Sequence, residues 1–440
     1  MKPYTKTKPK LTSKKASRQQ PPGNSACLDA LRPVIPAAIA TESATAFAHS
    51  LFPTNPFPAL KAALASDPPF ISSVLPKIVD WASSGSFTCT QRVSPTSELF
   101  TLPDYSARFI LANMFLLNNP SSILSFTDLY NSSNKLAIER IKCLMNYFSM
   151  QHPTTNPSRQ IIFERKRLVA PTAWSTVSHK PTQHVSFLQG TMESSTASKF
   201  VYFANKNLSK FKIGAYATQA DIVFSCCPEA FLSMALFGTI GDDQVITIKN
   251  LKRYSKYSGF DKSFRYAGPV VGEERVFDLL MMDATHVTNS VDAFSEGVVF
   301  RDLAKAALAF SPSSLGLVSA EAFGSFGTSS SSSATASTKA TTQAESVSIV
   351  TGHWGCGKFG GNKTHKFLQQ WMAASVVNSP SLTTRLEYSV FGDVALIKFW
   401  KTIVNAVLER EWSVGLVVTN LLLPNDLVDA DYEVFVANAL

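Results

Sequence analysis

Apolar residues recur at spacings of three and four along the first third of the chain, which places them on one face of a helix. Four segments carry this pattern, at 58–64, 71–81, 107–117 and 135–148. Prolines punctuate the region, and proline ends or interrupts helices. The pattern therefore predicts a helical accessory region over residues 27–160.

Beyond residue 160 the pattern changes to short apolar runs rich in β-branched and aromatic residues, which are typical of strands. These runs lie at 185–188, 200–203, 245–248, 277–282, 347–350 and 386–390. Helical patterns occur between and after them, at 228–237, 365–375 and 394–409. Strands that alternate with helices predict an α/β layered domain over residues 161–440.

Two segments have compositions that do not suit a packed core. Residues 1–25 are rich in Lys, Pro, Ser and Gln, and residues 1–20 hold seven of the 41 basic residues but no acidic one. The net charge of +9 is therefore concentrated in this tail, which we expect to be disordered. Three alternatives are left open for this tail: contact with nucleic acid, nuclear import, and a solvated segment with neither role. Residues 325–346, which include five consecutive serines, predict a disordered loop within one domain.

Several classes of protein are not expected. No run of about 18 uninterrupted apolar residues occurs, so we predict no membrane span. The six cysteines form no C-x-x-C pair, which argues against a disulfide framework or a structural zinc site. We expect no metal or cofactor and a reducing compartment, nuclear or cytoplasmic. The oligomeric state is left open.

A glycine-rich loop at 351–361 is the first candidate for chemistry, with five glycines within ten residues. Glycine permits positive φ and lets main-chain N–H groups approach a ligand closely. Successive N–H groups of this kind form a nest for phosphate or diphosphate. The predicted strand before the loop and the predicted helix after it favour the same use. On the glycines alone, a turn without a ligand explains the loop equally well.

The string Thr351-Gly352-His353-Trp354-Gly355-Cys356-Gly357-Lys358-Phe359-Gly360-Gly361 resembles the diphosphate-binding loop of poly(ADP-ribose) glycohydrolases. That family has Asn where His353 stands, and the rest of the core is intact. Segments 108–115, 142–148 and 161–165 are also similar to the family, and the resemblance covers most of residues 55–425. It implies a macrodomain-like mixed β-sheet flanked by helices, with an N-terminal all-helical extension. It also implies binding of ADP-ribose, or of poly(ADP-ribose) on modified proteins, whose diphosphate would meet Gly355, Cys356, Gly357, Phe359, Gly360 and Gly361.

The family's catalytic signature is three glycines and, seven residues later, Gln-Glu-Glu, and this chain departs from it. Matching segment 203–206 to the family places Ser209-Lys210-Phe211 at the glycines and Gln219-Ala220-Asp221 at Gln-Glu-Glu. In the family, the second Glu protonates the leaving ribose oxygen and then activates water, and the other Glu orients the ribose. Asp221 keeps a carboxyl group on a stem one methylene shorter, and Ala220 has none.

These changes predict that hydrolysis is weak or lost. Cleaving an O-glycosidic bond needs a positioned carboxyl group, and a displacement of roughly 1 Å can reduce the rate about 10²-fold. The first alternative is an active glycohydrolase that uses Asp221 as its acid/base. The second is a structural or interaction protein whose pocket is occluded by Lys210 or Phe211.

The nucleotide-binding half of the site matches the family better. The resemblance implies that Glu193 accepts a hydrogen bond from the adenine amino group and that Gln219 also contacts adenine. Phe391 corresponds to an aromatic residue that stacks on the base, and Asn205 to a polar contact near the ribose. Phe260 stands where the family has a tyrosine, so the ring is kept but the hydroxyl is not.

Each of these residues also has an ordinary structural explanation. Without the resemblance, Phe391 and Phe260 would be read as core aromatics, and Glu193 as a solvated carboxylate. Asp221 would stabilise a helix N-terminus through the helix dipole. Cys356 would be a small apolar filler of a packed loop.

Overall fold

The structure is a computed structural model, and it describes residues 56–84, 87–118, 122–152, 159–208, 213–272, 275–287, 292–312, 345–424 and 431–440. The basic tail at 1–25 lies outside the described residues, as does nearly all of the serine-rich segment at 325–346. Ser209, Lys210 and Phe211 also lie outside them, so the occlusion of the pocket stays a prediction.

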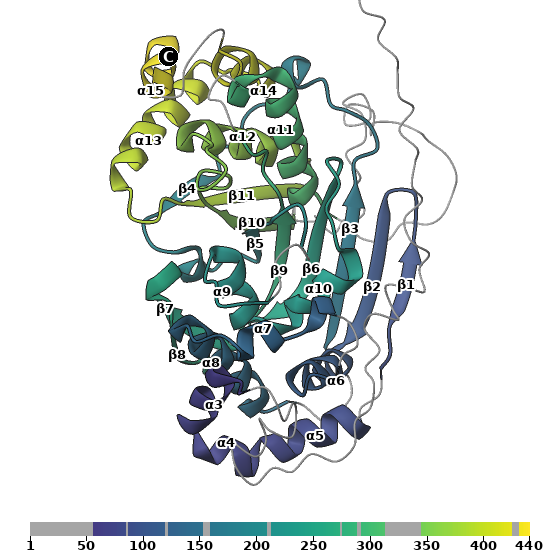
Figure 1. The fold of residues 1–440 in the computed structure, drawn as a ribbon. Coiled ribbons are helices and arrows are strands. Elements are labelled where there is room, and N and C mark those ends of the chain that lie inside the picture. Colours follow the sequence, from purple (N-terminus) through teal and green to yellow (C-terminus); the bar gives the residue numbers. More distant parts are fainter. Residues whose placement is uncertain are drawn as a thin grey trace, which may run out of the picture.

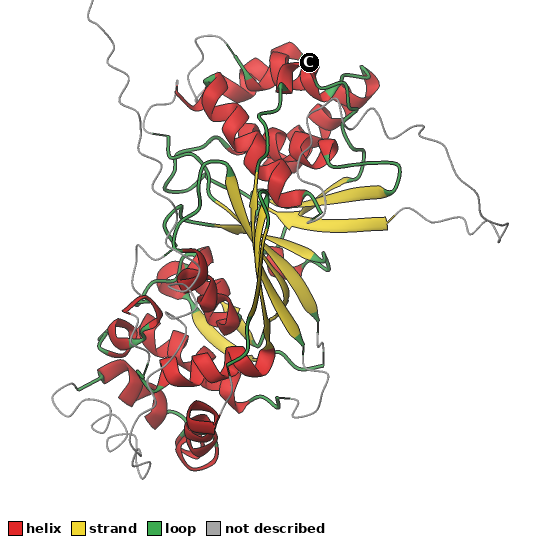
Figure 2. Ribbon diagram, turned by 90° about the vertical axis from the view of Figure 1, so that its right-hand side faces the viewer, coloured by secondary structure: helices red, strands yellow, loops and turns green. Residues whose placement is uncertain are grey.

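In the described part of the chain, nine strands form one mixed sheet at the centre of the molecule, in the order β1-β2-β3-β6-β9-β5-β10-β11-β4 (Figures 1 and 2). The strands are β1 (Thr90–Val93), β2 (Ser97–Pro103), β3 (Gln160–Arg167), β4 (Val185–Leu188), β5 (Lys199–Phe203), β6 (Gln244–Lys252), β9 (Val276–Met282), β10 (Glu345–Thr351) and β11 (Leu382–Ser389). Neighbours pair antiparallel from β1 to β9 and parallel from β9 to β4. The five parallel strands therefore bring their carboxyl ends to one edge of the sheet.

Helices cover both faces of this sheet (Figure 2). The first group packs on one face and consists of α3 (Pro58–Ala65), α4 (Pro68–Ser73), α5 (Leu75–Ser84), α6 (Asp104–Phe115), α7 (Thr127–Tyr130), α8 (Lys135–Ser149), α9 (Gln219–Cys226) and α10 (Leu232–Phe237). The second group packs on the other face and consists of α11 (Glu296–Phe310), α12 (Lys363–Val376), α13 (Val394–Glu409), α14 (Val414–Val417) and α15 (Tyr432–Ala439). A separate ribbon of β7 (Ser255–Ser258) and β8 (Arg265–Pro269) lies beside α8 and α9.

Strand β5 shows how the sequence specifies these two layers. Phe200 and Tyr202 belong to the core under the N-terminal helices, and Val201 between them belongs to the core under the C-terminal helices. Successive side chains of a strand point to opposite faces, so a strand buried on both sides reads as a continuous apolar run. The six runs predicted as strands are confirmed, and the predicted helices are too, except that 71–81 is divided between α4 and α5 and that 228–237 begins with a 3-10 turn before α10.

The hairpin β1–β2 is a feature that the apolar pattern does not predict. It lies within the region predicted to be helical and extends the sheet by pairing β2 with β3. None of the four side chains of β1 is buried, so the strand carries no apolar alternation. Its conformation is set by main-chain pairing with β2 instead.

The chain on both sides of the serine-rich segment contributes to the same sheet. Strand β10 begins at Glu345 and lies between β5 and β11.

Among the described helices, no single helix is long and apolar enough to cross a bilayer. Helix α9 and the segment Pro228–Phe237 have that length and apolarity only when taken together, and a bend of 119° separates them.

Helix α12 is buried along its length and carries a histidine in the core of the second layer. His365 is 1% exposed, and its ring lies 4.9 Å from the ring centroid of Phe294 and 5.1 Å from that of Tyr432. Its Nε2 is 3.1 Å from the carbonyl oxygen of Leu422. Burial, together with the adjacent Lys366 cation, lowers the pKa of His365 to about 3.

This burial predicts that the protein loses stability in mild acid. The unfolded chain protonates this imidazole below about pH 6.5, whereas the folded chain does not until about pH 3, so the free energy of unfolding falls as the pH drops through 6.5. We expect a loss of about 2 kcal/mol between pH 7 and pH 5 from this group. Urea denaturation across this range should show a shallower pH slope for His365→Gln than for the wild type. An unchanged slope would mean that His365 takes up its proton over the same pH range in the folded and the unfolded chain.

Candidate functional site

The ends of two neighbouring parallel strands bring the parts of the candidate site together. β5 ends at Phe203, and β10 pairs beside it and leads into the glycine loop. The N–H of Phe203 donates to Oε1 of Gln219 at 3.2 Å. A Cβ added at Gly352 would lie 3.6 Å from Phe203 Cζ and 3.6 Å from Met192 Sδ. The glycine loop, the segment that carries Glu193 and the start of α9 therefore meet around Phe203.

The glycine loop is closed by its own main-chain hydrogen bonds. Trp354 donates to Gly352, Cys356 to His353, Gly360 to Gly357 and Gly361 to Gly355, at 2.7–3.1 Å. Gly355 and Gly360 have φ of 77° and 71°, a region that favours glycine. The N–H groups of Gly355, Gly357, Lys358 and Phe359 donate to no acceptor among the described residues. A curled loop with unbonded amides is suited to an anion.

The loop is anchored to the strands by buried side chains. Trp354 is 1% exposed, and its Nε1 donates to the carbonyl of Met282 at the end of β9, at 3.0 Å. The carbonyl of Phe359 accepts the N–H of Val287 at 3.0 Å. His353 Nε2 lies 3.1 Å from the carbonyl oxygen of Val390, and burial lowers the pKa of this imidazole. The side chain of Cys356 is half-buried.

A buried ionic cluster supports the loop from below. Asp302 is fully buried and bonds the ammonium of Lys366 and, at 2.8 Å, Nη1 of Arg301. The stem of Lys366 lies directly under the loop, because a Cβ at Gly355 or Gly361 would be 3.5 or 3.1 Å from Lys366 Cε. Burial alone would raise the pKa of Asp302, but the Lys366 and Arg301 cations hold it below its ordinary value. The sequence patterns give no sign of this cluster.

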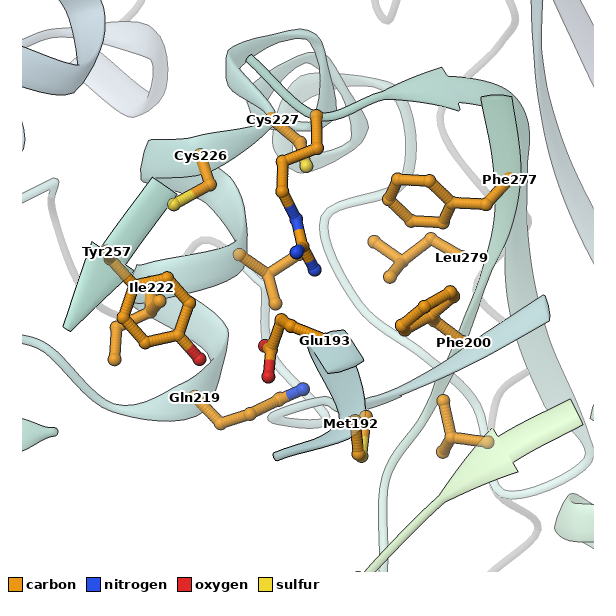
Figure 3. A pocket seen from close by; sticks show the side chains of 13 residues that line it. Met192, Glu193, Phe200, Gln219, Ile222, Cys226, Cys227, Tyr257, Phe277 and Leu279 are labelled. Atoms are coloured by element: carbon orange, nitrogen blue, oxygen red, sulfur yellow. The ribbon is translucent and has the colours of Figure 1, made fainter. Parts of the chain in front are cut away.

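Glu193 and Gln219 line one small cavity of about 10 Å³, which has room for about one water molecule (Figure 3). Glu193 belongs to a single helical turn, Met192–Ser194. Figure 3 shows its carboxylate, the Gln219 amide and the Tyr257 hydroxyl directed toward one another. Gln219 Nε2 is buried and has no acceptor among the described residues. Burial and the Glu193 carboxylate raise the pKa of the Tyr257 phenol.

Two exposed aromatic rings face each other at the rim of the site. Phe260 follows β7 and is 46% exposed, and Phe391 follows β11 and is 59% exposed. Their ring centroids are 6.1 Å apart with planes at 64°. Phe391 has φ of 49°, a conformation that costs about 1–2 kcal/mol for a side chain with a Cβ. Neither ring is a core residue, and backbone strain at an exposed aromatic indicates a functional role.

Asp221, the remaining carboxylate of the signature, is bound within the protein. Its Oδ2 accepts the Oγ1–H of Thr218 at 2.6 Å and the Thr218 N–H at 3.1 Å, and Thr218 Oγ1 in turn accepts the Asp221 N–H. This reciprocal pair is a capping box at the start of α9. Its Oδ1 is 3.4 Å from Nη1 of Arg140. Both oxygens are thus engaged, and the half-buried Ala220 offers no polar group.

Arg140 comes from the N-terminal helical region, and the motif comparison does not identify it. Its side chain is 2% exposed, its Nε donates to Ser225 Oγ at 2.9 Å, and its Nη1 donates to the carbonyl of Gly214. Arg140 lies four residues from both Leu136 and Leu144 on the apolar face of α8. A single charged residue on an apolar helix face indicates that the residue has a buried partner, and this signal was present in the sequence.

Asn205 follows β5, and its Oδ1 accepts the N–H of Asn207 at 3.0 Å. In the described part of the chain, no group of three or more His, Cys, Asp or Glu side chains is placed to hold a metal ion.

Comparison with protein families identifies the chain. The family model for the macro domain fold of poly(ADP-ribose) glycohydrolase matches residues 171–398, and the model for its helical domain matches residues 65–165. The chain belongs to the poly(ADP-ribose) glycohydrolase family. The expected macrodomain-like mixed sheet and N-terminal helical region are therefore confirmed, with the β1–β2 hairpin as an addition.

Individual relatives in this family are distant. The chain is 25% identical over 340 residues to poly(ADP-ribose) glycohydrolase 1 of Arabidopsis thaliana, covering 66% of this chain and 61% of the relative. It is 23% identical over 353 residues to poly(ADP-ribose) glycohydrolase 1 of Caenorhabditis elegans, covering 74% of this chain and 41% of the relative. The chain thus spans less than two thirds of either relative. The solved poly(ADP-ribose) glycohydrolase of Thermomonospora curvata is 12% identical, with a TM-score of 0.27 over 62% of this chain and 84% of that one.

Proposed function

We propose that this chain binds ADP-ribose, or the ends of poly(ADP-ribose) on modified proteins, where the glycine loop, the turn that carries Glu193 and the start of α9 meet. Four amides of the loop that have no acceptor among the described residues are available to the diphosphate. The Gln219 amide nitrogen and the Glu193 carboxylate provide a donor and an acceptor for the base, and Phe391 and Phe260 provide aromatic faces. A related solved structure from Thermomonospora curvata is a complex with the inhibitor ADP-HPD, which is consistent with such a ligand.

We further propose that hydrolysis of the ribose–ribose bond is weak or lost, and the contacts of Asp221 carry this proposal. A general acid must exchange its proton with the reacting oxygen. Asp221 would first have to leave its capping box, which costs about 1 kcal/mol. It would also leave the buried Arg140 without its carboxylate partner, which is more costly. In the first turn of α9 no other carboxylate is present.

Two measurements on the wild-type chain test the proposal. Titration calorimetry with ADP-ribose should give a heat of binding, and incubation with labelled poly(ADP-ribose) should release little or no ADP-ribose. An active member of the family, assayed in parallel, shows that the polymer is intact. Turnover by the wild type at rates usual for enzymes, on the order of 1 s⁻¹ or more, would favour Asp221 as a working acid/base. Absence of binding at millimolar ADP-ribose would favour an occluded pocket.

A double variant, Ala220→Glu with Asp221→Glu, extends the same assay. We expect it to remain inactive unless Lys210 and Phe211 are also changed to glycine, because the family keeps glycine where these side chains stand. The variants are compared for ADP-ribose binding as well, so that an inactive but folded protein is recognised.

A further inference from the structure

The exposed aromatic side chains of the described residues lie on loops that contact one another. Phe391, Tyr216 and Phe260 are 59%, 57% and 46% exposed, and the other large apolar side chains that are similarly exposed are aliphatic. We refer to these three residues as the aromatic rim. Exposed aromatic residues that cluster rather than scatter indicate a binding surface.

One main-chain hydrogen bond and one ring contact connect the loops that carry the three members of the rim. Tyr216 precedes Ala217, whose carbonyl accepts the N–H of Asp261 at 3.1 Å. Asp261 follows Phe260, whose ring contacts that of Phe391. The rim therefore runs from the loop before α9, through the loop after β7, to the loop after β11.

The middle of the rim is rigid. Gly259 has φ of 73°, and a Cβ there would lie 2.1 Å from the carbonyl oxygen of Ser263. Ser263 Oγ also accepts the N–H of Phe260 at 2.9 Å and donates to its carbonyl at 2.7 Å. A loop backbone fixed in advance in this way loses little entropy when a ligand binds to it.

We propose that Tyr216, the member of the aromatic rim not assigned to the first adenine, stacks on a second adenine of poly(ADP-ribose), next to the one held at Glu193 and Gln219. The inference rests on the proposed function and adds a preference for polymer over monomer. Three exposed rings offer more aromatic surface than the two faces of one base can use, and successive bases of a strand stack on such rings. Tyr216 is not among the residues that the resemblance assigns to the first adenine.

The charges beside the rim suit a polymer with diphosphate links. The segment 255–269, which contains Phe260, carries the exposed cations Lys256, Lys262 and Arg265 and one carboxylate, Asp261. Arg265 is held in place, because its Nη1 donates to the carbonyl of Phe264 at 2.6 Å. Cations interspersed with aromatic rings are typical of surfaces that follow a nucleotide strand.

The test compares ADP-ribose with short defined oligomers of poly(ADP-ribose) on the full chain. The wild type should bind the oligomers at least 10-fold more tightly than the monomer, because stacking adds affinity for each base. Tyr216→Ala should lose about 10-fold in oligomer affinity and leave monomer affinity unchanged. Tyr216→Phe should retain both, because the ring and not the hydroxyl is needed. Val169→Ala removes another exposed apolar side chain and serves as the matched control.

Each result that would contradict the inference differs from the others in which ligand loses affinity. Equal affinity of the wild type for monomer and oligomer overturns the inference while the proposed function stands. An equal loss of both ligands in Tyr216→Ala places Tyr216 in the monomer site and overturns it as well. Tyr216-dependent binding of single-stranded oligoadenylate that outcompetes poly(ADP-ribose) would assign the rim to nucleic acid instead. Binding of neither ADP-ribose ligand removes the proposed function together with the inference.

Discussion

Replacing Asp302 by alanine is expected to lower the free energy of unfolding by about 3–5 kcal/mol. Asp302 is fully buried, and its carboxylate is the ion-pair partner of Lys366, whose side chain is 3% exposed. Removing the carboxylate leaves that ammonium buried without a counter-ion. The loss of one partner of a buried pair is more damaging than the loss of both, because the remaining charge keeps its desolvation penalty.

Equilibrium denaturation of Asp302→Ala against the wild type measures this effect. Asp242→Ala is the matched control, because Asp242 also pairs with Arg301, at 3.2 Å, but is 68% exposed. Its removal should cost less than about 1 kcal/mol. The double variant Asp302→Ala with Lys366→Met should recover much of the lost stability. A loss below 1 kcal/mol for Asp302→Ala alone would show that Lys366 sheds its proton or reaches water.

The cluster also connects stability to the site. Lys366 lies over the ring of Trp354, 5.1 Å from its centroid, and its stem fills the space beneath Gly355 and Gly361. A displaced Lys366 would therefore change the shape of the loop. The loop that carries the family's most recognisable sequence thus depends on Asp302 of α11, an element that precedes it in the chain.

The secondary structure was largely predictable because each element is buried on defined faces. Helix α13 has the bounds that its apolar spacing predicts, Val394–Glu409. Strand β5 is a continuous apolar run in the sequence because its side chains are buried in two cores, one on each face of the sheet. The hairpin β1–β2 has no such pattern, since its pairing is satisfied by the main chain at the edge of the sheet. The periodicity of apolar residues predicts which face of an element is buried, and it predicts nothing where burial does not determine the structure.

The candidate site likewise has parts that the sequence predicts and contacts that it does not. The glycine loop and the residues Gln219 to Asp221 could be located because each is continuous in sequence. The contacts that decide what they do are not continuous: Asp221 meets Arg140 across 81 residues, and Lys366 meets Asp302 across 64. Such pairs follow from how α8 packs on α9 and α11 on α12. A motif can identify the carboxylate, but only the fold shows that both of its oxygens are engaged.

Gly355 and Gly357 provide a matched pair that tests the geometry of the loop, because the same substitution should have opposite outcomes two residues apart. Gly355 has φ of 77°, and a Cβ there would lie 2.7 Å from the Cβ of Ala284. Gly357 has no such φ, and a Cβ there would meet no atom within 4 Å. Gly355→Ala must therefore adopt a left-handed conformation, at about 1–2 kcal/mol, and also displace either the loop or the end of β9.

We expect Gly355→Ala to weaken ADP-ribose binding by at least about 100-fold, and Gly357→Ala to change it by less than about 3-fold. The 100-fold loss corresponds to about 2.8 kcal/mol, which we expect because a loop that relieves the strain at residue 355 misaligns the amides of Gly357, Lys358 and Phe359. Titration calorimetry measures the affinities, and thermal unfolding of both variants shows whether each is folded. Equal losses in the two variants would mean that the amides are not held in a fixed nest, and unchanged affinity in Gly355→Ala would mean that the diphosphate binds elsewhere.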